Sequence, residues 1–170
     1  MNEPKSQQVR TGRLLLRAFE QDDYKQIYSN WQSDPETFRY LEQSSCRDLE
    51  DSYRYCRARI PYYGIPYFFD WVIVQEDTKQ PIGEFNAAYR HRTNSVNVGF
   101  CLGSKFWNNG YMSEIIPVML QFFADAGIAS AEAECHRDNT VSRHVLEKSG
   151  FTLDGFLPES KLYHYSKKLK

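Results

Sequence analysis

The sequence predicts one α+β domain over residues 1–170, with a mixed, mostly antiparallel sheet of about seven strands and about four flanking helices. Short segments rich in aromatic and β-branched residues alternate with segments whose apolar residues recur at helical spacing. The chain also has the length of one ordinary domain, and no repeat, linker or low-complexity stretch divides it. We therefore expect a single hydrophobic core.

The first helix is predicted to follow an opening strand over 13–19. The acidic side chains of 20–23 can satisfy the free N–H groups at a helix start, and Pro35 marks the end of the segment. Apolar residues at helical spacing form one stripe along this helix: Tyr24, Ile27, Tyr28 and Trp31.

The second helix is expected to begin near Ser45, where Asp48 three residues later resembles a capping box, and to end at Pro61. Helical spacing assigns four residues to its buried face: Leu49, Tyr53, Cys56 and Ile60.

The other elements are predicted in the same way. Strands are expected over 67–75, 82–89, 95–102, 129–135, 151–157 and 161–168. Helices are expected over 110–126 and 140–149, each followed by a glycine suited to a left-handed C-cap, Gly127 and Gly150. Pro117 falls inside the first of these helices and predicts a kink or a late start.

Composition limits the partners. A net charge of −1 gives no electrostatic footprint for nucleic acid, so we expect no nucleic-acid partner. The start of the chain lacks the apolar region of a secretory signal, and no segment approaches the roughly 20 apolar residues of a membrane span, so we expect a cytoplasmic protein. Four scattered cysteines without a CxxC pair predict neither a metal site nor structural disulfides.

Two segments, Phe100–Glu114 and Asp138–Phe151, resemble the cofactor-binding motifs of the GNAT superfamily of N-acetyltransferases. The second contains the string Asn-x-x-Ser-x-x-x-Leu-Glu-Lys-x-Gly-Phe, and the opening Thr11–Arg17 is similar to the ribosomal-protein N-terminal acetyltransferase branch of that superfamily. The resemblance implies a single-domain GNAT-like fold over 1–170, with acetyl-coenzyme A (acetyl-CoA) as the cosubstrate and no metal.

The same resemblance implies which residues hold acetyl-CoA. The pyrophosphate loop places Trp107, Gly110 and Met112 at its first, fourth and sixth positions. Asn108, Asn109 and Met112 depart from the glycine, the basic residue and the alanine that are usual in the branch. A helix N-terminus after such a loop suits a pyrophosphate. The implied cofactor-binding residues are Phe100 and Leu102, through main-chain groups, and Trp107, Asn108, Asn109, Gly110, Met112, Ser113, Asn139 and Ser142.

Asn139 has two interpretations. In the family, an asparagine at this position hydrogen-bonds the pantetheine arm, and the amide offers both a donor and an acceptor. Asparagine also suits a helix N-cap, and both roles can hold together.

Acetyl transfer needs a neutral amine, stabilisation of the oxyanion and a proton for the departing thiolate. Many family members use a tyrosine as the acid, but Leu146 occupies that position here, so the branch implies Ser142 instead. Asp70 and Glu84 are the candidate bases. Burial amid the strand residues 67–74 is expected to raise the pKa of Asp70, and Glu84 lies on the adjoining hairpin strand, toward the region where the acceptor should enter. The alternative is that either acid is an ion-paired or edge-exposed residue without a role as the base.

The predicted function is acetyl transfer from acetyl-CoA to a primary amine, either a peptide N-terminus or a small-molecule amine. The alternatives are a non-catalytic acyl-CoA sensor and a structural domain with a decayed cofactor site. Oligomeric state is left open, although surface Tyr and Phe residues are compatible with a homodimer. Seven aromatic residues near the predicted acceptor side either line a pocket or fill the core: Tyr53, Tyr55, Tyr62, Tyr63, Tyr67, Phe68 and Phe69.

Overall fold

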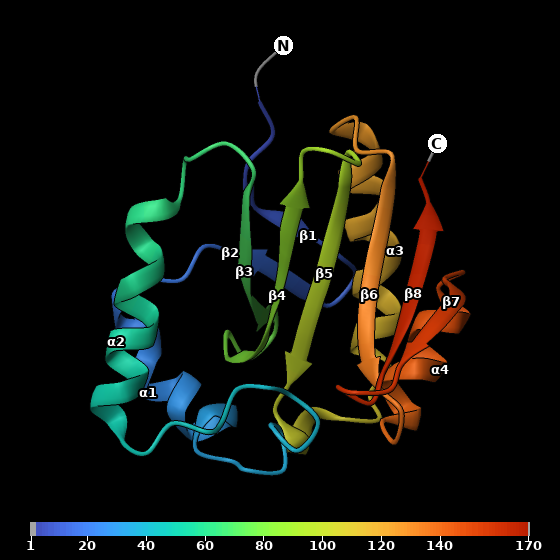
Figure 1. Cartoon of the computed structure of the whole chain (residues 1–170). Coiled ribbons are helices and arrows are strands. Elements are labelled where there is room, and N and C mark those ends of the chain that lie inside the picture. Colours follow the sequence, from blue (N-terminus) through green and yellow to red (C-terminus); the bar gives the residue numbers. More distant parts are fainter. Residues whose placement is uncertain (1–2, 170) are drawn as a thin grey trace. The chain divides into compact units, whose positions relative to one another are not determined.

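In the computed structural model, which describes residues 3–169, eight strands form one mixed sheet in the order β1-β2-β3-β4-β5-β6-β8-β7 (Figure 1). The pairs β1–β2, β2–β3, β6–β8 and β7–β8 are antiparallel, whereas β5–β6 is parallel. The strands are β1 Val9–Arg10, β2 Leu14–Arg17, β3 Phe68–Gln75, β4 Pro81–Arg90, β5 Ser95–Leu102, β6 Ser130–His136, β7 Thr152–Leu157 and β8 Leu162–Lys168. The predicted α+β class is confirmed, and the short strand β1 is the one that the sequence analysis missed.

The chain divides into two compact units. The first runs to Asn86 and includes Phe100–Asn109, and the second comprises Ala87–Gly99 and the chain from Gly110 onward. Strands β4 and β5 therefore pass through both units.

The helical part of the first unit begins with three consecutive short turns of different pitch. Ile27 and Trp31 of the predicted stripe are buried in its core, and Tyr24 packs against that core. Val72 and Val74 of β3 lie in the same cluster. The helical elements of this unit are η1 Gln21–Asp23, α1 Tyr24–Ile27, η2 Tyr28–Gln32, α2 Leu49–Arg59, η3 Ile60–Tyr62 and η4 Ser104–Phe106.

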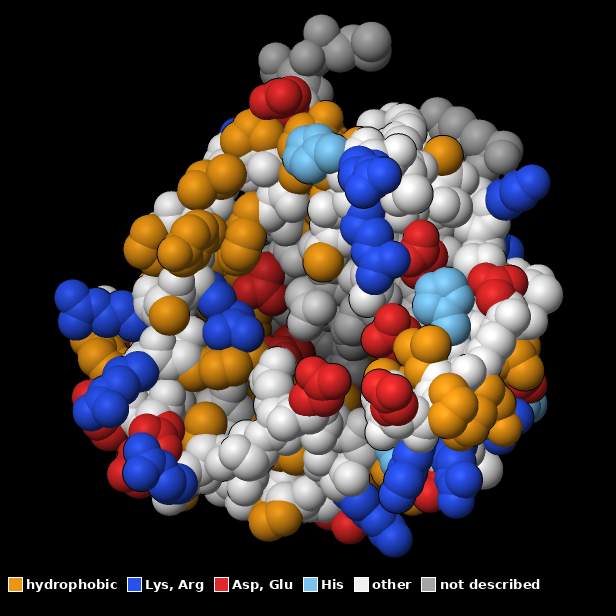
Figure 2. All heavy atoms as spheres, in the orientation of Figure 1, with side chains coloured by type: hydrophobic (Ala, Val, Ile, Leu, Met, Phe, Trp, Pro, Cys, Tyr) orange, Lys and Arg blue, Asp and Glu red, His pale blue; other side chains and the backbone are white. Residues whose placement is uncertain are grey.

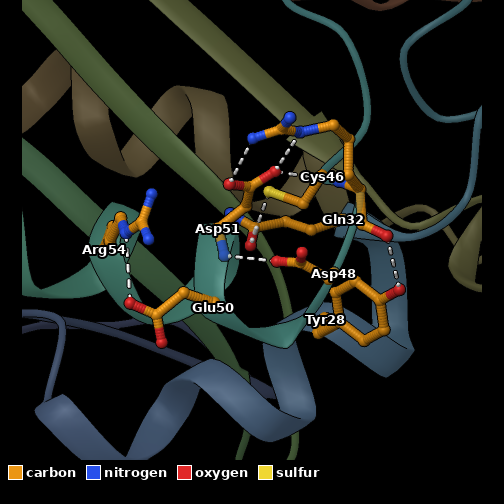
Figure 3. A network of polar contacts seen from close by, with 8 residues as sticks. Tyr28, Gln32, Cys46, Asp48, Glu50, Asp51 and Arg54 are labelled. Carbon is orange, nitrogen blue, oxygen red and sulfur yellow. Dashed lines mark hydrogen bonds and ion pairs between the residues drawn. The ribbon is translucent and has the colours of Figure 1, made fainter.

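Helix α2 begins later than predicted, because Asp48 rather than Ser45 is its N-cap. The Asp48 carboxylate accepts a hydrogen bond from the N–H of Asp51 at 2.9 Å. Arg47 pairs with Asp51 at 2.8 Å, and the Tyr28 hydroxyl donates to the Arg47 carbonyl oxygen at 3.3 Å (Figure 3). The segment before α2 is thus tied to η2, where the thiol of Cys46 also donates to Gln32.

The predicted buried face of α2 is confirmed at Cys56, which is buried, and is wrong at its two ends. Leu49 and Ile60 are 46% and 38% exposed, Tyr53 is half-buried, and Ser52 is buried instead. The Ser52 hydroxyl donates to the carbonyl oxygen of Tyr24 at 2.9 Å, so a polar residue fills a position that the apolar spacing did not include. The inward side of the helix therefore carries polar as well as apolar side chains.

The second unit contains helices α3 Tyr111–Asp125 and α4 Thr140–Lys148. Helix α3 continues through Pro117 and buries one apolar face, Met112, Ile115, Ile116, Met119, Leu120 and Phe123. Gly127 and Gly150 follow the two helices with positive φ values of 84° and 82°, as predicted, because glycine adopts this conformation without a Cβ clash.

The parallel pairing of β5 with β6 runs from Ser95↔Ser130 to Val98↔Ala133. Both strands continue beyond this register, to Leu102 and His136. Within residues 3–169, no helix has both the length and the apolar content needed to cross a bilayer.

Strand β4 approaches β5 closely at Gly83. A Cβ at Gly83 would lie 2.2 Å from the carbonyl oxygen of Cys101 and 2.9 Å from the Cα of Leu102. Gly83→Ala should therefore lower the free energy of unfolding by about 1–3 kcal/mol in chemical denaturation, because backbone atoms must shift. Gly155→Ala is the matched control, since a Cβ there meets nothing within 4 Å; equal losses in the two variants would contradict this account.

Candidate active site

Asp70 of β3 and Glu84 of β4 are both buried in the first unit, each 5% exposed. Side chains alternate along a strand, so Asp70 shares a sheet face with Val72 and Val74. These valines belong to the same core cluster as Cys56 of α2. Asp70 therefore lies on the sheet face that is covered by this cluster.

Helix α2 supplies the partners of both acids. Arg59 Nε lies 2.9 Å from Asp70 Oδ2, an ion pair without the alignment of a hydrogen bond. The Tyr55 hydroxyl donates a short hydrogen bond to Glu84 Oε2. The Arg59 guanidinium carbon is 3.4 Å from the centroid of the Tyr55 ring, so the two side chains are stacked. Asp70 Oδ1 is buried and has no hydrogen-bond partner among residues 3–169.

Burial dominates the acidity of this group. It raises the pKa of Asp70 from 3.8 to about 7, opposed by the positive charge of Arg59 and reinforced by the negative charge of Glu84. Burial also raises the pKa of Glu84, against Arg59 and the Tyr55 hydrogen bond. Both acids therefore retain a proton at higher pH than an exposed carboxyl group does.

The predicted pyrophosphate loop is ordered by its own side chains in the first unit. The Trp107 indole N–H donates to the Leu102 carbonyl oxygen at 2.7 Å, and the Asn109 amide donates to the Trp107 carbonyl oxygen at 2.9 Å. Asn108 has a positive φ of 61°, which asparagine tolerates better than most residues. Phe100 stacks on Phe85 with ring centroids 6.3 Å apart.

In the second unit, helix α3 starts at Gly110, whose φ is 74°. Gly110 has no side chain to occupy the first-turn N–H groups, which belong to residues including Met112 and Ser113. A helix N-terminus of this kind attracts anions. The Met112 side chain is buried in the unit, and Ser113 is half-buried.

Asn139 and Ser142 lie together at the start of helix α4. Asn139 is the N-cap, and its Oδ1 accepts a hydrogen bond from the Ser142 N–H at 3.1 Å. This confirms the capping interpretation and leaves the amide NH₂ group of Asn139 for another partner. The Cys135 thiol of β6 donates to the Asn139 carbonyl oxygen at 3.5 Å and also interacts with the Ser142 side chain.

Sequence reasoning missed Arg59 and gave Tyr55 only an aromatic role. The signal was present, because Ser52, Cys56 and Arg59 recur at helical spacing with Tyr55 beside them. A prediction that uses apolar residues alone does not detect a helix face of this mixed polar and apolar composition. Among residues 3–169, no group of three or more His, Cys, Asp and Glu side chains is arranged to hold a metal ion.

A family model described as an acetyltransferase (GNAT) domain matches residues 13–152. The chain therefore belongs to the GNAT family of acetyltransferases, enzymes for which acetyl-CoA is the cosubstrate. It is 29% identical over 153 residues to an uncharacterized N-acetyltransferase, YoaA, of Bacillus subtilis (strain 168). The aligned region covers 88% of this chain and 85% of the relative.

Solved structures share the fold. The microcin C7 self-immunity acetyltransferase MccE, in complex with acetyl-CoA and AMP, superposes with a TM-score of 0.83 at 18% identity, over 92% of this chain and 93% of that chain. The ribosomal L7/L12 α-N-protein acetyltransferase RimL, in complex with coenzyme A, superposes with a TM-score of 0.82 at 17% identity, over 95% and 98%. The predicted GNAT-like fold is thus confirmed.

The raised pKa of Asp70 predicts a specific pH dependence of stability. Because the folded-state pKa of about 7 lies above the usual value of 3.8, the folded chain binds the proton more tightly between these values. The contribution of this group to the free energy of unfolding is therefore greatest at low pH and is lost as pH rises toward 7. At about 1.4 kcal/mol per pKa unit, a shift of about three units corresponds to a loss of about 4 kcal/mol.

In chemical denaturation from about pH 4.5 to pH 8, the free energy of unfolding of Asp70→Asn should lack the fall with rising pH that Asp70 causes in the wild type. Asp77→Asn, which changes an exposed aspartate in the turn between β3 and β4, is the control and should keep the wild-type dependence. An Asp70→Asn profile parallel to that of the wild type would refute the assignment.

Proposed function

We propose that this chain transfers an acetyl group from acetyl-CoA to a primary amine, either a peptide N-terminus or a small-molecule amine, by direct attack in a ternary complex. The observation that carries the proposal is the start of α3. A helix of 15 residues begins at a left-handed glycine with no side-chain cap, directly after a loop braced by Trp107 and Asn109. That arrangement suits the pyrophosphate of coenzyme A.

The cofactor-binding residues of the proposal are those implied by the family motifs. The N–H groups of Gly110, Met112 and Ser113 bind the pyrophosphate, and the amide of Asn139 binds the pantetheine arm. Main-chain groups of Phe100 and Leu102 contact the pantetheine and the thioester. Because the Leu102 carbonyl oxygen already accepts from Trp107, its N–H is the group that we assign to this contact.

In the proposed mechanism, the ammonium group of the acceptor first loses a proton to the acidic pair Asp70 and Glu84, directly or through water. The neutral amine then attacks the thioester carbonyl carbon, and the carbon–sulfur bond breaks. The Ser142 hydroxyl hydrogen-bonds the departing sulfur and relays a proton from water. This hydrogen bond stabilises the leaving group more strongly as negative charge develops on the sulfur.

The thiols support direct attack rather than an acyl-enzyme. Burial raises the pKa of both Cys101 and Cys135, so neither is present as a thiolate near neutral pH. A covalent route needs a thiolate activated by a neighbouring base.

Hydrophobic side chains gather at the upper left of the face shown in Figure 2, over the C-terminal end of α2. Ile60, Tyr62 and Ile65, which follow α2 in the chain, are 38%, 51% and 48% exposed. These residues support an acceptor that carries apolar groups beside its amine.

We also propose that residues 1–170 form one GNAT-type domain in the cytoplasm. The family model spans segments of both compact units, and β4 and β5 pass through both. The four cysteines are free thiols, which is typical of a reducing compartment. A homodimer remains a prediction.

Purified protein should gain thermal stability with acetyl-CoA and should release free thiol when a primary amine is added. The assay screens small amines and N-terminal peptides with apolar first residues, with acetyl-CoA alone as the blank. Binding without turnover across the screen would favour the acyl-CoA sensor. Absence of any thermal shift would favour a domain with a decayed cofactor site.

Substitutions at Asn139 separate cofactor binding from helix capping. Asn139→Ala should raise the Michaelis constant for acetyl-CoA by about 5–30-fold, equivalent to about 1–2 kcal/mol, and should lower the free energy of unfolding by about 1 kcal/mol. Asn139→Ser keeps a capping oxygen, so it should raise the Michaelis constant while leaving stability nearly unchanged. If Asn139→Ser showed wild-type kinetics, Asn139 would act only as a helix cap and would not bind the cofactor.

Ser142→Ala completes this comparison. It should leave the affinity for acetyl-CoA within about threefold and lower turnover by about 10–100-fold, because the contact strengthens only in the transition state. A kinetically silent Ser142→Ala would assign the acid role to water.

A further inference from the structure

Four side chains form a polar cluster within the first unit, in which the acids Asp70 of β3 and Glu84 of β4 are buried and Tyr55 and Arg59 of α2 are half-buried. Arg59 contacts Asp70 through Nε and donates from Nη1 to the Tyr55 carbonyl oxygen at 3.1 Å. Its guanidinium stacks on the ring of Tyr55, whose hydroxyl donates to Glu84. Arg59 therefore contacts one acid directly and the other through Tyr55.

The cluster has a net charge of −1 when both acids are ionised, because Arg59 is its one cation. Tyr55 of the cluster stays neutral, since burial raises its pKa. The titratable groups that face the cluster stay neutral for the same reason, because burial raises the pKa of each: Cys46 before α2, Cys56 of α2, Tyr63 after η3 and Cys101 of β5. Asp23, which faces Cys56, is neutralised by Arg17 at 2.7 Å.

A net negative charge with an unbonded carboxylate oxygen is costly in a buried site. Asp70 Oδ1 is such an oxygen, since it is buried and no group in the described part of the chain forms a hydrogen bond with it. The cluster lowers this cost by binding one proton or by attracting one cation. Two acids beside one arginine therefore behave as one pair that shares a single proton.

We infer that Arg59 is a positioning residue that joins Asp70 and Glu84 into one acid–base pair, and that this pair accepts the proton of the substrate ammonium. The inference rests on the proposed function. In the step, an N–H bond of the ammonium breaks, the proton binds to the pair, and the neutral amine keeps its electron pair for attack. Arg59 stabilises the deprotonated pair, so its removal should make the pair a stronger proton binder.

Removing Arg59 tests the role. With an amine that the wild type acetylates, Arg59→Gln should move the acidic limb of the kcat/KM profile upward by about one pH unit or more. The Michaelis constant for acetyl-CoA should stay within about threefold. Arg59→Lys should restore much of the wild-type profile, because it returns the charge. Arg57→Gln removes an equal charge from the exposed side of the same helix and should leave the limb in place.

Removing an acid should act in the opposite direction. Glu84→Gln leaves Asp70 with Arg59 and without a neighbouring negative charge, so proton binding should weaken and the acidic limb should move to lower pH. This variant also carries the test if Arg59→Gln does not fold. Loss of activity or stability without any movement of the limb in either variant would make Arg59 a structural ion-pair residue and overturn the inference.

A second measurement does not need acetyl transfer. The pH window in which the free energy of unfolding falls should move upward in Arg59→Gln and downward in Glu84→Gln. If the wild type acetylates no amine, the proposed function fails, while these windows still decide whether the pair shares a proton under the control of Arg59. Windows unchanged from the wild type would overturn the shared pair itself.

Discussion

Burial of Asp70 and Glu84 beneath helix α2 is the constraint on which the first unit depends. Two carboxylates in a sheet core require compensation, and α2 supplies it with Arg59 and the Tyr55 hydroxyl. That requirement fixes the rotation of α2, because Ser52, Cys56 and Arg59 must all face inward. It also leaves Leu49 and Ile60 exposed at the two ends of the helix.

This constraint explains where prediction from the sequence failed. Apolar spacing finds helices that bury hydrocarbon, and it placed α3 and the strands β5 and β6 within about one residue. In α2 the inward side is partly polar, so the same rule found Cys56 but assigned Leu49 and Ile60 to the core and missed Ser52 and Arg59. The start of α2 was misplaced for a related reason, since Ser45 and Asp48 are both good capping residues and only the contact with Asp51 distinguishes them.

The second unit was more predictable, because its features are local. Gly127 and Gly150 follow helices in a left-handed conformation, and Asn139 caps α4. Each of these features can be predicted from residues within one helical turn of it. The proposed roles of Asn139 and Ser142 in binding come from family resemblance and not from geometry. The grouping of Asp70 with Arg59 depends on a contact between a strand and a helix, which the sequence alone does not specify.

The central claim is that acetyl-CoA and a primary amine react directly while both are bound. Initial rates measured at several fixed concentrations of the amine, with acetyl-CoA varied, test it most directly. The account predicts double-reciprocal lines that intersect, as expected for a ternary complex. Parallel lines, together with acetyl label on the protein in the absence of amine, would show a covalent intermediate and contradict it.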